Sequence, residues 1–156
     1  MTLKAEPLTA EAFAPYGDVL VAPASGRTDF GETLVTLRPH ARPSLAIALV
    51  PPTEGVTLNA TKMERHEFTS QSFIPLDVSR YLIFVAPKTA EGKPDITKAR
   101  AFIAGPGQGI TYRHDTWHHP MVTLDKPAQF AVYMWRDDKT DDEFVDITPT
   151  VIEIPT

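Results

Sequence analysis

The sequence predicts an all-β fold, an antiparallel sandwich or barrel with a few short helices. Five runs of five to seven residues are rich in β-branched or aromatic side chains and are bounded by turn-forming residues. Fifteen prolines among 156 residues interrupt any long helix. Helical and extended segments do not alternate along the chain, which argues against a parallel α/β fold. The predicted strands are Thr33–Leu37, Ser44–Val50, Tyr81–Ala86, Arg100–Ala104 and Gln129–Trp135.

The remaining local signals are short. In residues 8–17, LTAEAFAPYG, Thr9 suits a helix N-cap and Pro15 ends the helix after one or two turns. A second short helix is expected after Asp95. Gly107 and Gly109 frame a tight turn before the next extended segment. A chain of this length can bury one core, so residues 1–156 are expected to form a single domain.

Composition excludes several classes of protein. The net charge of -5, with no run of basic residues, disfavours a nucleic-acid partner. The chain has no cysteine, which excludes disulfides and thiolate metal sites and is compatible with a reducing cytosol. The start, MTLKAEPLT, lacks the apolar core of a signal peptide, and the longest apolar run, Leu45–Val50, is too short to span a bilayer. A cytoplasmic protein without a membrane partner is expected.

One predicted strand has an unusual polar face. In the segment TKMERHEF, alternation places Lys62, Glu64 and His66 on one face and the residues between them on the other. This face is either exposed to solvent or lines a polar pocket inside a barrel. Alternation alone favours solvent, because antiparallel strands commonly bury only one face.

A second polar segment, YRHDTWHHP, holds three of the five histidines. His118 and His119 are neighbours, so on a strand they would point to opposite faces, and at most one would enter a pocket directly. Imidazole titrates near neutral pH, which makes such a residue a candidate base, acid or metal ligand. His114 and His40 have no evident partner in the sequence and are interpreted as surface residues.

These two segments together resemble the signature regions of the ureidoglycolate lyase family. The matching stretches are MERHEFTSQSFIPL (Met63–Leu76) and GQGITYRHDTWHHP (Gly107–Pro120). FAPYGDVL, VAPKTAEGKPDITKARAF and MWRDDKTDDEF stand around them in the family's order. The resemblance implies a cupin-type β-barrel, or jelly roll, that cleaves (S)-ureidoglycolate to glyoxylate and urea in allantoin and purine degradation. It also implies a carbon–nitrogen lyase of the amidine-lyase class that forms a homodimer and needs no organic cofactor.

The spacing of cupin metal ligands is only partly kept. A cupin's first region reads His-x-His and, three or four residues later, Glu. Here Glu64, His66 and Gln71 take those places, and His118 falls on the histidine of the second region. Arg113 and Asp115 stand where a typical cupin has proline and glycine. A divalent metal at Glu64, His66, Gln71 and His118, Ni²⁺ by resemblance, is therefore one expectation, and a metal-free site is the other.

Cleavage of ureidoglycolate needs a base for the hydroxyl proton, an acid for the leaving nitrogen and a group that holds the carboxylate. Glu64, His66 and His118 are the expected catalytic residues, with the division between acid and base left open. The alternative for Lys62 is a solvated lysine, and for Arg136 a surface ion pair with Asp137 or Asp138. The residues expected to bind the substrate are Lys62, Gln71, Tyr112, Trp117, His119 and Arg136.

Two other functions fit the same residues. A cupin-type module that binds a small carboxylate without turnover would also show degraded metal ligands. A metal-dependent cupin enzyme of another reaction class would contain stoichiometric metal. The concentration of titratable groups at Glu64, His66 and His118 favours catalysis over simple binding.

Overall fold

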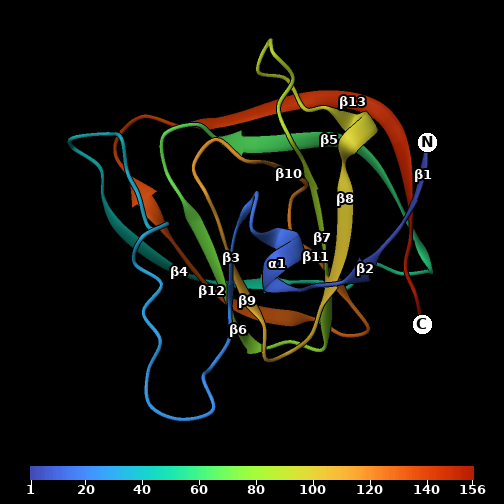
Figure 1. Ribbon diagram of the computed structural model, residues 1–156, viewed down its shortest axis with the longest axis horizontal. Coiled ribbons are helices and arrows are strands. Elements are labelled where there is room, and N and C mark those ends of the chain that lie inside the picture. The colour runs from blue at the N-terminus through green and yellow to red at the C-terminus, as the bar shows by residue number, and fades with distance from the viewer.

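The computed structural model describes residues 1–156 and contains the predicted all-β barrel with few short helices (Figure 1). The larger sheet consists of β1 (Thr2–Lys4), β2 (Glu6–Pro7), β5 (Thr57–His66), β7 (Arg80–Ala86), β8 (Arg100–Ala104), β10 (Trp117–His118), β11 (Val122–Leu124) and β13 (Asp142–Glu153). The smaller sheet consists of β3 (Gly17–Leu20), β4 (Arg42–Val50), β6 (Gln71–Asp77), β9 (Gly109–Tyr112) and β12 (Ala128–Arg136).

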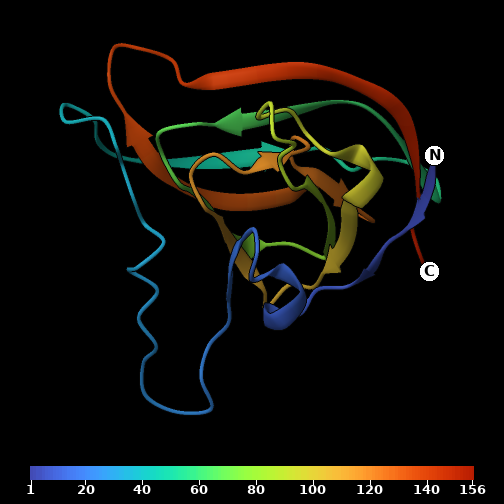
Figure 2. The same cartoon turned by 45° about the horizontal axis from the view of Figure 1, so that its top comes forward.

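The strand order explains which segments meet. The larger sheet runs β1-β13-β5-β10-β7-β8-β2, with β11 also paired to β7, and the smaller runs β3-β9-β6-β12-β4. Most pairs are antiparallel, whereas β1 pairs with β13 and β2 with β8 in parallel. Because β1 and β13 are neighbours, both chain ends lie on the same side of the barrel (Figures 1 and 2).

Four of the five predicted strands are confirmed, in β4, β7, β8 and β12, and the strand predicted at Thr33–Leu37 is wrong. Only Thr36 forms an isolated bridge, to Thr69. Hydrogen bonds to Ser70 take the place of strand pairing at Val35. The Ser70 hydroxyl accepts from the Val35 amide at 3.0 Å, and the Ser70 amide donates to the Val35 carbonyl. These bonds satisfy the backbone locally without a continuous ladder.

The short helices follow the sequence signals. Helix α1 (Ala10–Phe13) begins after Thr9, whose hydroxyl accepts from the Ala12 amide at 3.2 Å, and it ends before Pro15. A 3₁₀ turn, η1 (Ile96–Lys98), follows Asp95. Phe13 is fully buried and packs on the rings of Phe102 and Tyr112, so α1 anchors to the core between the sheets. No helix has the length and apolar character needed to cross a membrane.

The outer side of the smaller sheet is apolar. Segment 21–41 swings away from the sheets at the lower left of both views (Figures 1 and 2) and returns to β4. A cavity of about 500 Å³ lies between part of this segment and the sheet. The side of β4 and β6 that contributes Leu45 and Ile74 to this cavity is also open to solvent, and we call this surface the apolar β4 face. It consists of Leu45, Ile47, Leu49, Ile74 and Leu76.

Candidate active site

Glu64, His66 and His118 lie together inside the barrel. β10 pairs with β5 through a single residue pair, His118 opposite Glu64, so the two side chains share a face. His66 lies two residues along β5 on the same face. One potential ligand atom from each residue lies within 4.8 Å of the other two. The rings of His66 and His118 are 5.4 Å apart between centroids.

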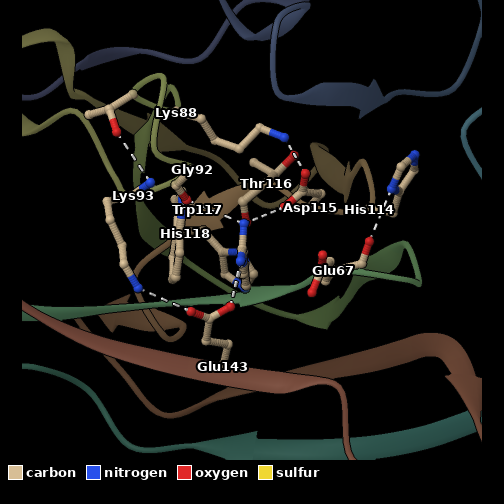
Figure 3. Close-up of polar contacts among 12 residues, drawn as sticks. Glu67, Lys88, Gly92, Lys93, His114, Asp115, Thr116, Trp117, His118 and Glu143 are labelled. Carbon is tan, nitrogen blue, oxygen red and sulfur yellow. Dashed lines mark hydrogen bonds and ion pairs between the residues drawn. The ribbon is translucent and has the colours of Figure 1, made fainter.

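His118 is held in one orientation. Its ring stacks on Tyr112, with centroids 4.0 Å apart and planes 15° from parallel. Its Nδ1 lies 2.9 Å from the carbonyl oxygen of Thr116, which can only accept, so Nδ1 carries a proton (Figure 3). Nε2 is therefore the atom directed at Glu64, whose Oε1 lies 3.5 Å away. Nε2 is buried and has no hydrogen-bond partner.

His66 is held from two sides. Its Nε2 lies 3.2 Å from Oε1 of Gln71, whose amide nitrogen contacts the sulfur of Met134. Its Nδ1 lies 2.8 Å from Oδ1 of Asp142, the residue opposite it on β13. The direction of approach is unfavourable for a hydrogen bond, so Nδ1 is buried and unsatisfied despite this short distance.

The cluster shifts the acidity of its members. Burial acts against ionisation of Glu64, but His118, and then the charges of His66 and His119, outweigh it and lower the pKa of the carboxyl. Burial, together with the charge of His118, lowers the pKa of His66 although nearby carboxylates oppose the shift. Burial also lowers the pKa of His119. An ionised Glu64 carboxylate near the imidazoles of His66 and His119, which resist protonation, suits either proton transfer or a bound cation.

The residues fit a divalent metal ion. In neutral His118 the Nδ1 proton leaves a lone pair on Nε2, which faces the Glu64 carboxylate. Two lone pairs at this distance repel each other unless a proton or a cation lies between them. A bond from the second ring nitrogen to a backbone carbonyl is also the usual support of a metal-binding histidine. Glu64, His66 and His118 would supply three ligands, and the Gln71 amide oxygen adjoins them.

Trp117, which was predicted to bind the substrate, does not join the cluster. It lies on the other face of β10, is fully buried, and donates from Nε1 to the Gly92 carbonyl at 3.0 Å (Figure 3). The Arg65 guanidinium lies 4.6 Å from the centre of its ring. Arg65 also binds Asp115 at 2.8 Å and Glu143 at 2.6 Å. These contacts fasten β5, β10 and β13 together behind the site.

The other predicted residues lie around the cluster. Lys62 is exposed on the Glu64 face of β5. His119 follows the end of β10, where strict alternation no longer applies, and its charge acts on Glu64. Arg136 is exposed at the end of β12 and forms no ion pair with Asp137 or Asp138, and Asp137 is paired with Arg38 at 2.8 Å. His114 stays outside the cluster and contacts the Glu67 carbonyl (Figure 3).

Sequence reasoning did not identify Asp142 as a neighbour of His66. Its position depends on the register between β13 and β5, which places it opposite His66 across more than seventy residues of chain. No local pattern contains that register. The stacking of Tyr112 on His118 was also unforeseen, although Tyr112 itself was a candidate.

The sequence is similar to those of known proteins. The family model described as ureidoglycolate lyase matches residues 1–153. A ureidoglycolate lyase of Burkholderia cepacia is 40% identical over 141 residues, covering 83% of this chain and 77% of the relative. One of Schizosaccharomyces pombe is 33% identical, covering 96% and 93%. A structure of Bacillus subtilis oxalate decarboxylase aligns with 91% of this chain and 30% of its own, at 17% identity and a TM-score of 0.42. By the family model and these sequence relatives, the chain belongs to the ureidoglycolate lyase family.

Proposed function

We propose that this protein is a ureidoglycolate lyase that cleaves (S)-ureidoglycolate to glyoxylate and urea. The observation that carries the proposal is the cross-strand pair of Glu64 and His118, a carboxylate and an imidazole nitrogen 3.5 Å apart inside the barrel. The names of the relatives support the choice of substrate. The reaction is then a carbon–nitrogen lyase reaction of the amidine-lyase class, part of allantoin degradation.

The chemistry divides between the two residues. Glu64 accepts the proton of the substrate hydroxyl, and the oxygen electrons form the C=O bond of glyoxylate. The C–N bond breaks, and its electrons go to the ureido nitrogen. Protonated Nε2 of His118 gives its proton to that nitrogen, so urea leaves as a neutral molecule. The proton on Glu64 returns to His118 across the short gap between them, which restores both groups. No water is consumed.

His66 and Gln71 orient the substrate in this proposal. Gln71 is buried beside His66, and either side chain can hydrogen-bond a ureido oxygen or the hydroxyl. Tyr112 holds the His118 ring by stacking, which fixes the direction of Nε2. The alternative to this use of Glu64 and His118 is a divalent metal, Ni²⁺ by resemblance, held by Glu64, His66, Gln71 and His118, which would supply Lewis-acid polarisation of substrate oxygens.

The direct test is to incubate the purified protein with each enantiomer of ureidoglycolate and to follow glyoxylate and urea together. We expect one urea for each glyoxylate, from the (S) enantiomer. Ammonia released in step with glyoxylate, without added urease, would place the protein among the amidohydrolases. Failure to turn over either enantiomer while binding them would favour the binding module.

We further propose that residues 1–156 act as one domain in the cytoplasm and assemble as a homodimer through the apolar β4 face. Leu45, Ile47 and Leu49 are 65–70% exposed on an edge strand. An apolar strip of this kind on a strand at the edge of a sheet is typical of a surface that another chain covers. A second copy is the partner that the family resemblance implies.

Ile47→Lys is expected to convert the dimer to a monomer, because it places a charge in the centre of the apolar β4 face. Light scattering coupled to gel filtration measures the mass. Val56→Lys is the matched control, since Val56 is 62% exposed but lies outside this face, and we expect it to stay dimeric. A monomeric wild type at micromolar concentration, or a dimeric Ile47→Lys variant, would contradict this interface.

A further inference from the structure

A polar cavity of about 520 Å³ lies where β4 begins and β12 ends. All of its lining residues carry ionisable side chains, and none is apolar. Three of them, His40, Arg42 and Arg136, are basic, and the other two, Asp137 and Asp138, are acidic. A cavity without apolar lining recognises its occupant through charge and hydrogen bonds.

The two arginines of this cavity face each other without counterions. Arg42 is directly opposite Arg136 in the β4–β12 ladder, so their side chains leave the sheet on the same face. No carboxylate lies within ion-pair distance of either guanidinium, and Asp137 is already bound by Arg38. Like charges placed directly across a ladder destabilise the fold. An anion bound between the two guanidinium groups would offset their repulsion, which would explain why the pair is present.

The cavity adjoins the catalytic cluster through β12. Arg136 lies two residues beyond Met134, on the same face and about 7 Å along the strand. Met134 is opposite Gln71 in the ladder and contacts its amide, and Gln71 contacts His66. Lys62, the other candidate for the carboxylate, lies two residues from Glu64 in the direction away from His66. The two arginines therefore lie on the barrel's inward-directed face, at the end of the catalytic cluster nearer to His66.

We propose that Arg42 and Arg136, with His40 at the rim, bind the carboxylate of a small 2-hydroxy acid substrate. This inference rests on the proposed function for the identity of the reacting molecule, and it adds Arg42 and His40 to the site. The planar forks hold the carboxylate while the hydroxyl-bearing carbon extends toward Gln71, His66 and Glu64. Asp138, which has no cationic partner within ion-pair distance, repels a second carboxylate and so favours a monoanion.

The test uses glycolate, a monoanion with the hydroxyl and carboxylate but no ureido group. Calorimetry should give a dissociation constant that Arg42→Gln raises roughly ten- to a hundredfold, the effect of losing a charge-assisted hydrogen bond. The binding should also weaken with added salt. Arg27→Gln is the matched control, because Arg27 is an exposed arginine paired with Asp29 far along segment 21–41, and it should bind glycolate as the wild type does.

A second measurement uses hydroxymethylurea, which lacks the carboxylate and can release formaldehyde and urea. Arg42→Gln should lose at least about tenfold more kcat/KM with ureidoglycolate than with hydroxymethylurea. Its melting temperature without ligand should equal or exceed that of the wild type, because a like-charge pair has been removed. A weaker affinity then cannot be attributed to unfolding.

The outcomes separate this proposal from the proposed function. Glycolate binding that depends on Arg42 supports the carboxylate site even if ureidoglycolate is not turned over. Turnover of ureidoglycolate with KM and glycolate affinity unchanged in Arg42→Gln overturns the carboxylate site and leaves the lyase intact. An equal loss of kcat/KM with ureidoglycolate and hydroxymethylurea would also overturn it.

Discussion

Glu64→Gln is expected to lower kcat for ureidoglycolate by about a hundred- to ten-thousand-fold, the usual contribution of one proton-transfer group. The substitution keeps the shape of the side chain and removes its negative charge, so this side chain can no longer accept the hydroxyl proton. His118→Ala should cause a similar loss of kcat. It also removes a buried ring that stacks on Tyr112, so its melting temperature should fall.

Steady-state kinetics with the (S) enantiomer, together with a thermal melt of each variant, distinguishes these effects. His114→Ala is the control, since His114 lies in the same segment but contacts only the Glu67 carbonyl. It should keep the activity of the wild type. A Glu64→Gln variant with unaltered kcat would show that Glu64 is not the base, whatever the products of the reaction are.

Gly17→Ala is expected to lower the free energy of unfolding by about 3 kcal/mol or more. A Cβ at Gly17 would overlap the backbone carbonyl of Thr111 on β9, which is held in the ladder and cannot move aside without breaking it. Gly17 is opposite Tyr112, whose ring supports His118. Displacement of β9 would therefore disturb the site as well as the fold.

Urea denaturation followed by tryptophan fluorescence measures this loss. Gly107→Ala provides a matched control because its Cβ would meet no atom within 4 Å, and it should stay within about 0.5 kcal/mol of the wild type. If Gly17→Ala unfolds at the same urea concentration as Gly107→Ala, β3 and β9 are not packed as closely as described.

Local patterns predicted the parts of the fold that depend on neighbouring residues. Thr9 identified the N-cap of α1, and four strands were recognised from their β-branched and aromatic content. The strand at residues 33–37 was mispredicted because its composition matches a strand while the Ser70 side chain replaces the partner it would need. Composition indicates whether a segment favours an extended conformation, but a β-strand also requires a neighbouring segment with which it can form a ladder of backbone hydrogen bonds.

In the candidate site, too, local sequence identified some residues, and pairing between distant strands determines the others. Glu64 and His66 could be identified as sharing a face because they are two apart on one strand, and the same rule places Trp117 and His118 on opposite faces. Asp142 and Arg42 could not be found, because each reaches the site through a pairing between distant strands. The registers of β13 on β5 and of β4 on β12 are properties of the whole barrel.

The difference in exposure between the catalytic cluster and the arginine pair affects how this fold can diversify. Glu64, His66 and His118 are held by the core, where a replacement disturbs packing as well as chemistry. Arg42 and Arg136 lie on exposed strand ends, where most substitutions cost little stability. Substitutions at the exposed strand ends can therefore change which carboxylic acid substrate binds, while the buried catalytic residues stay the same. Members of this fold can then differ in substrate without a change in Glu64, His66 or His118.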